Sequence, residues 1–364
     1  MTGPLAGLRV VELAGIGPAP FAGMLLADLG ADVVRIDRPG GPALAVVPAE
    51  RDRLGRGKRS VALDLKDDDD VRRVLDLLGR ADLLLEGMRP GVAERLGVGP
   101  DTCLARNPCL VYGRMTGWGQ DGPDAGTAGH DITYVAVTGA LGASAPPSDP
   151  PMPPLNLLGD FAGATYLVVG LLAALHEARM SCVGQVVDAA MVDSTAHLTT
   201  MFHGLLAAGA WQDRPGSNLL DGGAPFYGSY RTSDGGWMAV GALEPAFYDE
   251  LLARLGIDPA EGDRTDPSSW PALRRRIADT FATRTRDDWA EVFAGSDACV
   301  APVLGLGEAT RHPHLVARST FVERDGVVQP APAPRFSRTS ATLDRPPPAA
   351  GQHTDEVLSE WLTP

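Results

Sequence analysis

The sequence predicts an α/β protein with two domains: a Rossmann-like large domain with a mostly parallel sheet, and a smaller α+β domain. Two observations indicate this fold class. Short apolar strands alternate with helical patterns through the first half of the chain, which favours a parallel sheet with helices on both faces. After about residue 210 the pattern changes to a hairpin followed by several helices, and 364 residues are enough for two hydrophobic cores.

The large domain begins with a βαβ unit. Residues 8–13 are predicted to form a strand, 15–20 a glycine turn, 21–29 a helix and 32–36 the second strand. Gly15 and Gly17 match the start of a dinucleotide fingerprint, but Pro20 stands where the third glycine belongs. We therefore reject a nicotinamide or flavin dinucleotide site, while the fold itself can still be Rossmann-like.

The alternation continues along the chain. Four acidic residues at 67–70 indicate a helix start, because the helix dipole favours negative charge there. Further strands are expected at 60–65, 83–85, 110–112 and 184–189, and a further helix at 191–206.

The smaller domain is expected between residues 224 and 310. A strong turn signal at 233–236 separates two predicted strands, 226–232 and 237–241. Helices are predicted at 245–255, along the stripe Leu273, Ile277 and Phe281, and after the capping pair Thr285 and Asp288, with a strand at 299–304. The predicted domains are 1–190, a connector at 191–223, the small domain at 224–310 and a return to the large domain at 311–364, closed by a helix at 354–362.

Charge and composition restrict the classes of partner. The net charge is −14 and the sequence pI is about 4.9, which argues against nucleic acid or an anionic membrane. An anionic ligand would need a local basic cluster, and such residues do collect at strand ends: Arg35, Arg38, Arg51, Arg53, Arg56, Lys58, Arg59, Arg89 and Arg114.

Other sequence features predict a cytoplasmic protein without a metal site. The first residues show no charged-then-apolar leader, so a cytoplasmic location is expected. The four cysteines form no C-x-x-C pair and are expected to be reduced thiols, and the seven histidines form no zinc motif. Nothing here predicts a metal site.

Asp160 stands before an apolar run, 161–175, of about 15 residues, which is short for a membrane span and suited to a buried helix. One interpretation makes Asp160 a helix N-cap, and the other makes it a catalytic carboxylate on a rigid element. Its expected pKa has opposing influences: Leu155, Leu157, Leu158 and Phe161 would raise it by desolvation, while a helix N-terminus would lower it. A second titratable cluster, Gly129–Tyr134 with His130 and Asp131, strengthens the catalytic interpretation.

The chain resembles the α-methylacyl-CoA racemases of the family III CoA-transferase superfamily along almost its whole length. Segment 41–50 matches none of the motifs. The motifs that carry the resemblance are Leu8–Leu13, Gly30–Pro39, Gly55–Ser60, Leu63–Lys66, Arg89–Val92, Gly117–Gln120, Gly129–Asp131, Pro154–Asp160, Asp221–Tyr227, Val240–Pro245 and Asp297–Val300.

The resemblance implies a reaction and a set of site residues. It implies that His130 and Asp160 are the two acid/base groups that move the α-proton of a 2-methylacyl-CoA thioester. The enolate oxygen needs N–H donors, for which the backbone around His130 and Asp131 is our candidate. The resemblance implies that Glu244 of the partner subunit supports His130 in an interlocked homodimer. It places CoA along Arg38, Leu63, Asp64, Leu65, Lys66, Arg89, Gly129 and Tyr134, and implies no metal, nicotinamide or flavin cofactor.

Two alternatives stay open at this point. A CoA-transferase of the same superfamily would use Asp160 as a nucleophile that forms a mixed anhydride and would not require His130. We expect a longer glycine run in that branch than Gly222-Gly223 or Gly235-Gly236. The second alternative is a CoA-binding protein without catalysis, in which Asp160 is only a helix cap.

Overall fold

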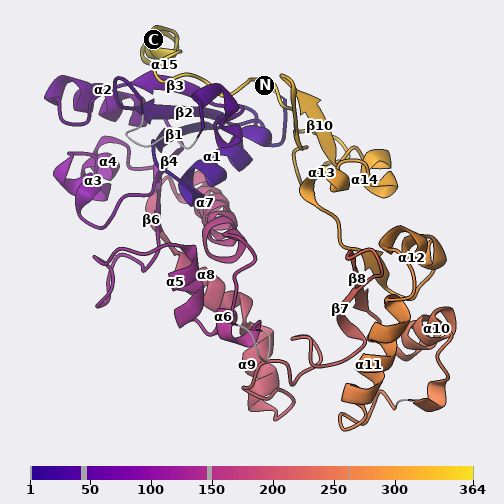
Figure 1. The fold of residues 1–364 in the computed structure, drawn as a ribbon. Coiled ribbons are helices and arrows are strands. Elements are labelled where there is room, and N and C mark those ends of the chain that lie inside the picture. The colour runs from indigo at the N-terminus through magenta and orange to yellow at the C-terminus, as the bar shows by residue number, and fades with distance from the viewer. Residues whose placement is uncertain (1, 42–46, 146–149, 262, 364) are drawn as a thin grey trace. The chain divides into compact units, whose positions relative to one another are not determined.

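The computed structural model describes residues 2–41, 47–145, 150–261 and 263–363, which form two compact units (Figure 1). Segment 41–50, which matched no motif, falls partly outside the described residues. The large unit comprises Met1–Thr138, Pro153–Leu198 and Phe321–Pro364, and the small unit comprises Gly139–Met152 and Thr199–Thr320. The predicted domain boundaries stay predictions, and each unit is described by itself.

The large unit is built on a six-stranded parallel sheet with the order β3-β2-β1-β4-β5-β6. This is the doubly wound Rossmann order, and it confirms the predicted α/β class. The strands are β1 (Arg9–Leu13), β2 (Asp32–Asp37), β3 (Arg59–Ala62), β4 (Leu83–Glu86), β5 (Val111–Thr116) and β6 (Gln185–Ala190). A separate antiparallel hairpin, which the sequence did not predict, pairs β10 (Phe321–Arg324) with β11 (Val327–Pro330).

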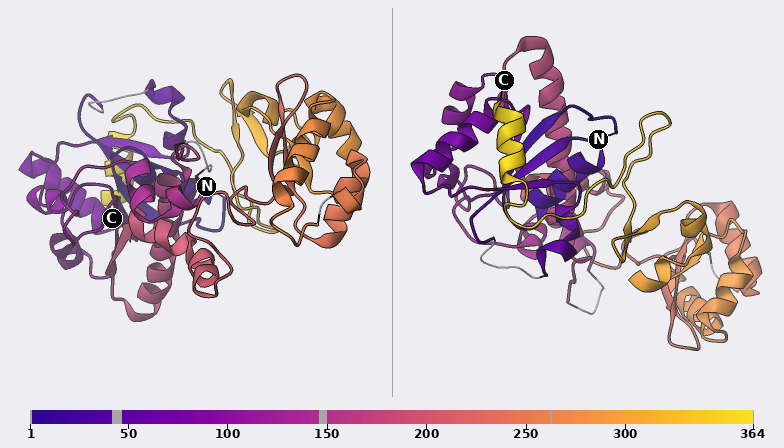
Figure 2. Two further views of the ribbon diagram at one scale, coloured as in Figure 1. Left: turned by 60° about the horizontal axis from the view of Figure 1, so that its bottom comes forward. Right: turned by 90° about the horizontal axis from the view of Figure 1, so that it is seen from above.

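Helices cover both faces of this sheet because neighbouring residues of each strand point to opposite sides. Val10 packs in one core with α1 and α7, whereas Val11 packs in the other core with α2 and α15. The yellow C-terminal helix lies beside the first strands in Figure 2. The helices are α1 (Pro18–Asp28), α2 (Asp68–Leu78), α3 (Val92–Arg95), α4 (Pro100–Arg106), α5 (Asp131–Val137), α7 (Ala162–Ser181), α8 (Met191–Leu198) and α15 (Thr354–Leu362).

Helix α7 is longer than the sequence predicted, and a single π-helical turn, Leu157–Phe161, precedes it. The combined segment Leu157–Ser181 has a mean hydropathy of 1.7 and is long and apolar enough to cross a membrane by length and composition. In the structure it packs against β5, β6 and α1 and contributes Leu167, Leu171 and Leu175 to the core. It is therefore the central core helix of the large unit.

The small unit has its own core around a three-stranded antiparallel sheet in the order β7-β8-β9. The predicted hairpin and the capping box of Thr285 and Asp288 are confirmed. The predicted helix at 191–206 is in fact two helices, because the chain passes from one unit to the other at Thr199. The elements are α6 (Ala140–Ala143), α9 (Thr200–Ala207), β7 (Tyr227–Arg231), β8 (Trp237–Gly241), α10 (Pro245–Leu255), α11 (Trp270–Phe281), α12 (Arg286–Phe293), β9 (Val300–Pro302), α13 (Leu306–Ala309) and α14 (Pro313–Ala317).

A fully buried ion pair sits beneath the first turns of α1. Lys58 Nζ lies 2.6 Å from Glu12 Oε2 and donates a hydrogen bond of 2.9 Å to the carbonyl of Pro20. A Cβ atom at Gly23 would meet Glu12 Oε2 at 1.8 Å, so the helix must carry glycine where it crosses the pair. This arrangement fixes the start of α1, which borders the pocket described below.

Candidate active site

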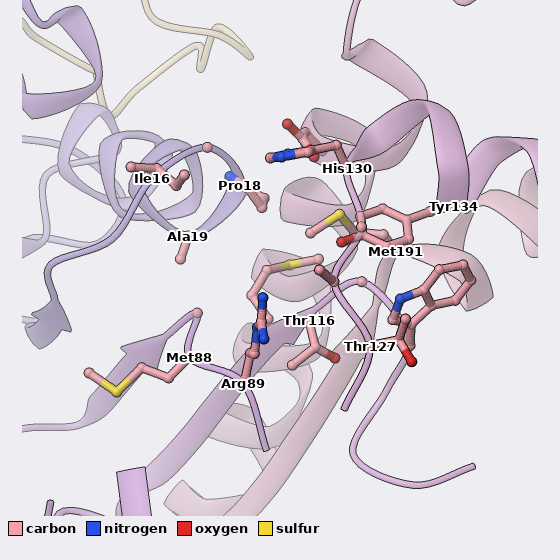
Figure 3. Close-up of a pocket in the computed structure, with 18 of the residues that line it drawn as sticks. Ile16, Pro18, Ala19, Met88, Arg89, Thr116, Thr127, His130, Tyr134 and Met191 are labelled. Atoms are coloured by element: carbon pink, nitrogen blue, oxygen red, sulfur yellow. The ribbon is translucent and has the colours of Figure 1, made fainter. Parts of the chain in front are cut away.

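A pocket of about 300 Å³ opens at the carboxyl edge of the parallel sheet. Its walls come from the segments that follow β1, β4 and β5, from the end of β5 itself, and from Met191 directly after β6. The pocket therefore lies where the strand order reverses between β1 and β4, the position at which open α/β sheets bind ligands. Figure 3 shows His130 and Arg89 on opposite sides of it, with Pro18 and Tyr134 beside His130.

His130 stands at the N-cap position of α5, and its side chain is exposed. The hydroxyl of Thr133 accepts a hydrogen bond from the His130 N–H at 3.0 Å and donates one to the His130 carbonyl at 2.7 Å. The preceding Gly129 must be glycine, because a Cβ there would lie 2.5 Å from the ring of Tyr134. The backbone of His130 is thus fixed while its imidazole stays free to face the pocket.

Asp160 lies within the π-helical turn, and its half-buried side chain lines the same pocket. Asn156 Nδ2 donates a 2.9 Å hydrogen bond to Asp160 Oδ2. The helix α7 begins after Phe161 and has no side-chain cap, so the interpretation of Asp160 as an N-cap is wrong. Gly17 explains the glycine turn after β1: a Cβ there would lie 3.4 Å from Asp160 Oδ2, and its φ of 71° favours glycine.

The pKa of Asp160 is raised above its ordinary value. Burial is the main cause, and the nearby Asp131 carboxylate adds to it, whereas the hydrogen bond from Asn156 and the charge of His130 oppose it. The apolar residues that the sequence analysis placed around Asp160 do not fully account for its burial, because two of them, Leu155 and Leu157, are themselves 70% and 48% exposed. Phe161 instead packs against Phe21 of α1, with ring centroids 4.6 Å apart.

The side chain of Asp131 connects the two candidate groups. Its Oδ1 accepts hydrogen bonds from the N–H groups of Gly159 at 2.7 Å and Asp160 at 2.8 Å. A Cβ at residue 159 would lie 2.6 Å from that oxygen, which explains the glycine before Asp160. Sequence reasoning considered only the backbone around Asp131, so it missed this carboxylate bridge between α5 and the π-helical turn.

The glycine loop at 117–119 makes room for two aromatic rings. A Cβ at Gly117 would lie 2.1 Å from the Tyr134 ring, so this position requires glycine. Trp118 meets Tyr134 edge to face at 4.9 Å, and both line the pocket. Burial and the charge of Asp160 raise the pKa of Tyr134, which Arg89 partly offsets. The rest of the wall is largely apolar, with Ile16, Met88, Met115 and Met191.

The expected CoA-contacting residues divide into two groups. Arg89, Gly129 and Tyr134 line the pocket, whereas Arg38 and the segment Leu63–Lys66 lie outside its lining, after β2 and β3 at the same carboxyl edge of the sheet. The predicted strand at 60–65 ends at Ala62, so Leu63, Asp64, Leu65 and Lys66 form a turn before α2. The Asp64 carboxylate accepts from the Lys66 N–H at 3.0 Å, which closes this turn.

Most of the basic residues that the sequence grouped as an anion site are internal ion-pair partners. Lys58 pairs with Glu12, Arg56 with Asp28 at 2.6 Å, and Arg114 with Glu86 at 2.9 Å. Arg35 pairs with Asp37, and Arg59 with Asp32, Glu356 and Glu360. Arg38, Arg51, Arg53 and Arg89 make no ion pair among the described residues and are the basic groups left for a ligand, and Arg89 is the one of these that lines the pocket.

Glu244 belongs to the small unit, where it stands at the N-cap position of α10. Its expected relation to His130 stays a prediction. Among the described residues there is no cluster of three or more His, Cys, Asp or Glu side chains arranged to hold a metal ion.

An imidazole and a carboxylate in one pocket at the switch point of a Rossmann-type sheet define a site for acid–base or nucleophilic chemistry. Residues 5–354 match the model of CoA-transferase family III, and the chain belongs to this family.

Several known proteins are similar over nearly the whole chain. The α-methylacyl-CoA racemase of Mus musculus is 45% identical over 361 residues, with 98% of this chain and 93% of that protein covered. The α-methylacyl-CoA racemase of Homo sapiens is 43% identical over 363 residues, with the same shares covered. The crystal structure of a CaiB/BaiF family protein from Brucella suis superposes with a TM-score of 0.85 at 25% identity, covering 99% of this chain and 100% of that one.

We expect Asp160→Asn to raise the free energy of unfolding at pH 7. The raised pKa means that the folded protein holds this proton to a higher pH than the unfolded chain does. The parent therefore loses stability as pH rises from the ordinary value of 3.8 to the raised folded value, and the variant escapes this loss. Urea unfolding across this pH range should show a gain that grows with pH and then levels off.

The matched control is Glu94→Gln, because a hydrogen bond from Arg114 lowers the pKa of Glu94. That variant should lose stability relative to the parent above the ordinary pKa of Glu94, with the loss disappearing in acid. A gain for Asp160→Asn that is the same at every pH would show that its pKa is not raised.

Proposed function

We propose that this protein is an isomerase that interconverts the R and S epimers of 2-methylacyl-CoA thioesters. The observation that carries the proposal is the placement of His130 and Asp160 in one pocket, bridged by the Asp131 carboxylate. The similarity to two α-methylacyl-CoA racemases over 98% of the chain supports the same conclusion.

In the proposed mechanism one group removes the α-proton and the other returns a proton to the opposite face of Cα. The thioester makes this proton acidic, because the resulting charge is delocalised as an enolate. Two groups are required, one for each face, and each must change protonation state during a turnover. The raised pKa of Asp160 suits this exchange, since a carboxyl whose pKa lies closer to that of imidazole can both accept and donate the proton.

The enolate oxygen requires hydrogen-bond donors. The first amides of a helix have no acceptor within the helix, and α5 begins at Asp131, directly after His130. We assign the backbone N–H of Asp131 to the enolate oxygen, because this donor is fixed in place before the reaction begins. The hydrogen bonds that the Asp131 side chain accepts from Gly159 and Asp160 then hold this donor and the two acid–base groups in a fixed relative position.

The CoA moiety is assigned to the carboxyl edge of the sheet. Arg89 would hold part of the CoA group at the pocket, and Arg38 with the turn Leu63–Lys66 would hold the part farther along the same edge. A guanidinium suits phosphate because its planar fork offers two parallel donors.

The family also contains transferases by its own description, so acyl transfer through Asp160 is the competing function. In that chemistry the Asp160 carboxylate attacks the thioester carbonyl and forms a mixed anhydride with release of the CoA thiolate. His130 has no required part in that reaction.

We expect His130→Ala and Asp160→Ala each to lower racemisation by about 10²–10⁴-fold, the usual contribution of a general acid or base. The measurement is proton NMR of (R)- and (S)-2-methylacyl-CoA in heavy water. Each variant keeps one base, so each should exchange the α-proton of one epimer slowly without inverting it, and the two variants should prefer different epimers.

His176→Ala is the control, because His176 lies on the exposed side of α7 outside the pocket. If Asp160→Ala abolishes acyl transfer, His130→Ala retains it, and no deuterium enters Cα, the protein is a transferase. If His130→Ala racemises at the parent rate, the two-base mechanism is wrong.

We expect Arg89→Ala and Arg38→Ala to raise KM for acyl-CoA and to flatten its dependence on salt, because charge-assisted phosphate contacts are lost. Steady-state kinetics between low and moderate ionic strength measure both effects. Arg106→Ala is the control, since Arg106 pairs with Asp76 at 2.8 Å at the end of α4, away from the pocket. Unchanged KM and salt response in both test variants would refute the assigned site.

We further propose a homodimer in which Glu244 acts in the partner's site. Strand β6 is an edge of the sheet, and its Val186 is 40% exposed, while Val169 of α7 is 61% exposed. Apolar groups beside an unpaired edge strand indicate a surface that another chain covers. Sedimentation equilibrium at micromolar concentration should therefore give a dimer.

Co-expression of Asp160→Ala with Glu244→Ala in differently tagged subunits tests the sharing of Glu244. If Glu244 acts across the interface, the purified heterodimer contains one intact site and regains activity that neither homodimer has. A heterodimer as inactive as both parents would place Glu244 in the site of its own subunit.

A further inference from the structure

Two thiols outside the pocket meet at the amino edge of the parallel sheet. Cys109 precedes β5, and Cys182 ends α7, so the two residues come from different elements and are 73 positions apart. Both are exposed. The Cys109 Sγ–H donates to the Cys182 carbonyl over 3.0 Å, which brings the Cys109 thiol against the residue that carries the second thiol.

The backbone holds this pair together. The N–H of Gly184 donates to the carbonyl of Pro108 at 2.5 Å, one residue before β6 begins its parallel pairing with β5. A Cβ at Gly184 would lie 2.0 Å from the carbonyl oxygen of Leu110, so only glycine permits this approach. The proximity of the thiols is therefore fixed by the sheet and does not depend on a mobile surface loop.

We propose that Cys109 and Cys182 are a redox modification site that closes to a reversible disulfide in the presence of a peroxide. One thiolate attacks hydrogen peroxide and becomes a sulfenic acid, with loss of hydroxide. The second thiol displaces the sulfenic oxygen as water and forms the S–S bond. Two thiols lose two protons and two electrons in total, and one peroxide is reduced to two waters.

The other two cysteines lack this arrangement. Cys103 is buried and its pKa is raised to about 12, which keeps it as an unreactive thiol. Cys299 is exposed but lies in the small unit, and its thiol contacts the carbonyl of Asp297. The hydrogen bond from Cys182 raises the pKa of Cys109, so the oxidation should become faster as pH increases.

The bridge would tie the end of α7 to the start of β5. Both elements reach the pocket at their other ends, where Asp160 precedes α7 and Thr116 ends β5. The crosslink would close a long loop of the unfolded chain, and such crosslinks stabilise the folded state. We therefore expect greater resistance to unfolding and an unchanged pocket.

The experiment treats the fully reduced full-length protein with a small excess of hydrogen peroxide and counts free thiols after denaturation. The four thiols of the parent should fall to two, with a Cys109–Cys182 peptide found by mass spectrometry and reversed by dithiothreitol. Cys109→Ser and Cys182→Ser should form no crosslinked peptide and lose at most one thiol under the same conditions, whereas Cys299→Ser should still lose two and form the crosslink.

The melting temperature of the oxidised parent should rise by several degrees, with no rise in either single variant. Crosslinks between molecules, oxidation of Cys109 to a sulfinic acid without a crosslink, or equal thiol loss in the parent and in Cys182→Ser would each overturn the proposal. An intramolecular disulfide that leaves the melting temperature unchanged would overturn its stabilising role.

Discussion

The hydrogen bonds accepted by the Asp131 carboxylate are the contact on which the candidate site depends. They join two stretches of chain almost thirty residues apart, one carrying His130 and the other Asp160. An N–H group left buried without a partner costs about 1–3 kcal/mol, so the two donors favour one relative placement of the helix and the turn. The same placement requires glycine at two positions. A side chain at Gly159 would collide with the Asp131 carboxylate, and one at Gly17 would crowd the Asp160 carboxylate.

The elements of the large unit could be predicted from sequence because their local signals agree with their tertiary role. Val10 and Val11 are adjacent apolar residues that enter opposite cores, as expected of a parallel strand buried on both faces. Asp67 precedes a helix and caps it, as its position among four acids indicated. The sheet order also places the predicted His130 and Asp160 at the edge where ligands bind.

What could not be predicted depends on partners that are distant in sequence. The sequence shows Lys58 and Arg59 as positive charges, but only the fold shows that Glu12 and Asp32 neutralise them in the core. Likewise, Asp160 before an apolar helix has the pattern of a cap, and the π-helical turn that redirects its side chain leaves no local signature. The end of β3 at Ala62 was missed for the opposite reason: Leu63 and Leu65 look like strand residues, although the chain turns there.

The closing helix α15 makes the large unit dependent on the order in which the chain is synthesised. Its Trp361 donates to the carboxylate of Asp32 in β2, and Glu356 and Glu360 pair with Arg59 in β3. These contacts join the first strands to a helix about three hundred residues later in the chain, so the part of this sheet face that α15 covers stays open until that helix has been made. The inserted small unit is complete by Thr320 and can condense earlier. The large unit, although it contains the first strands, therefore completes its packing after the small unit.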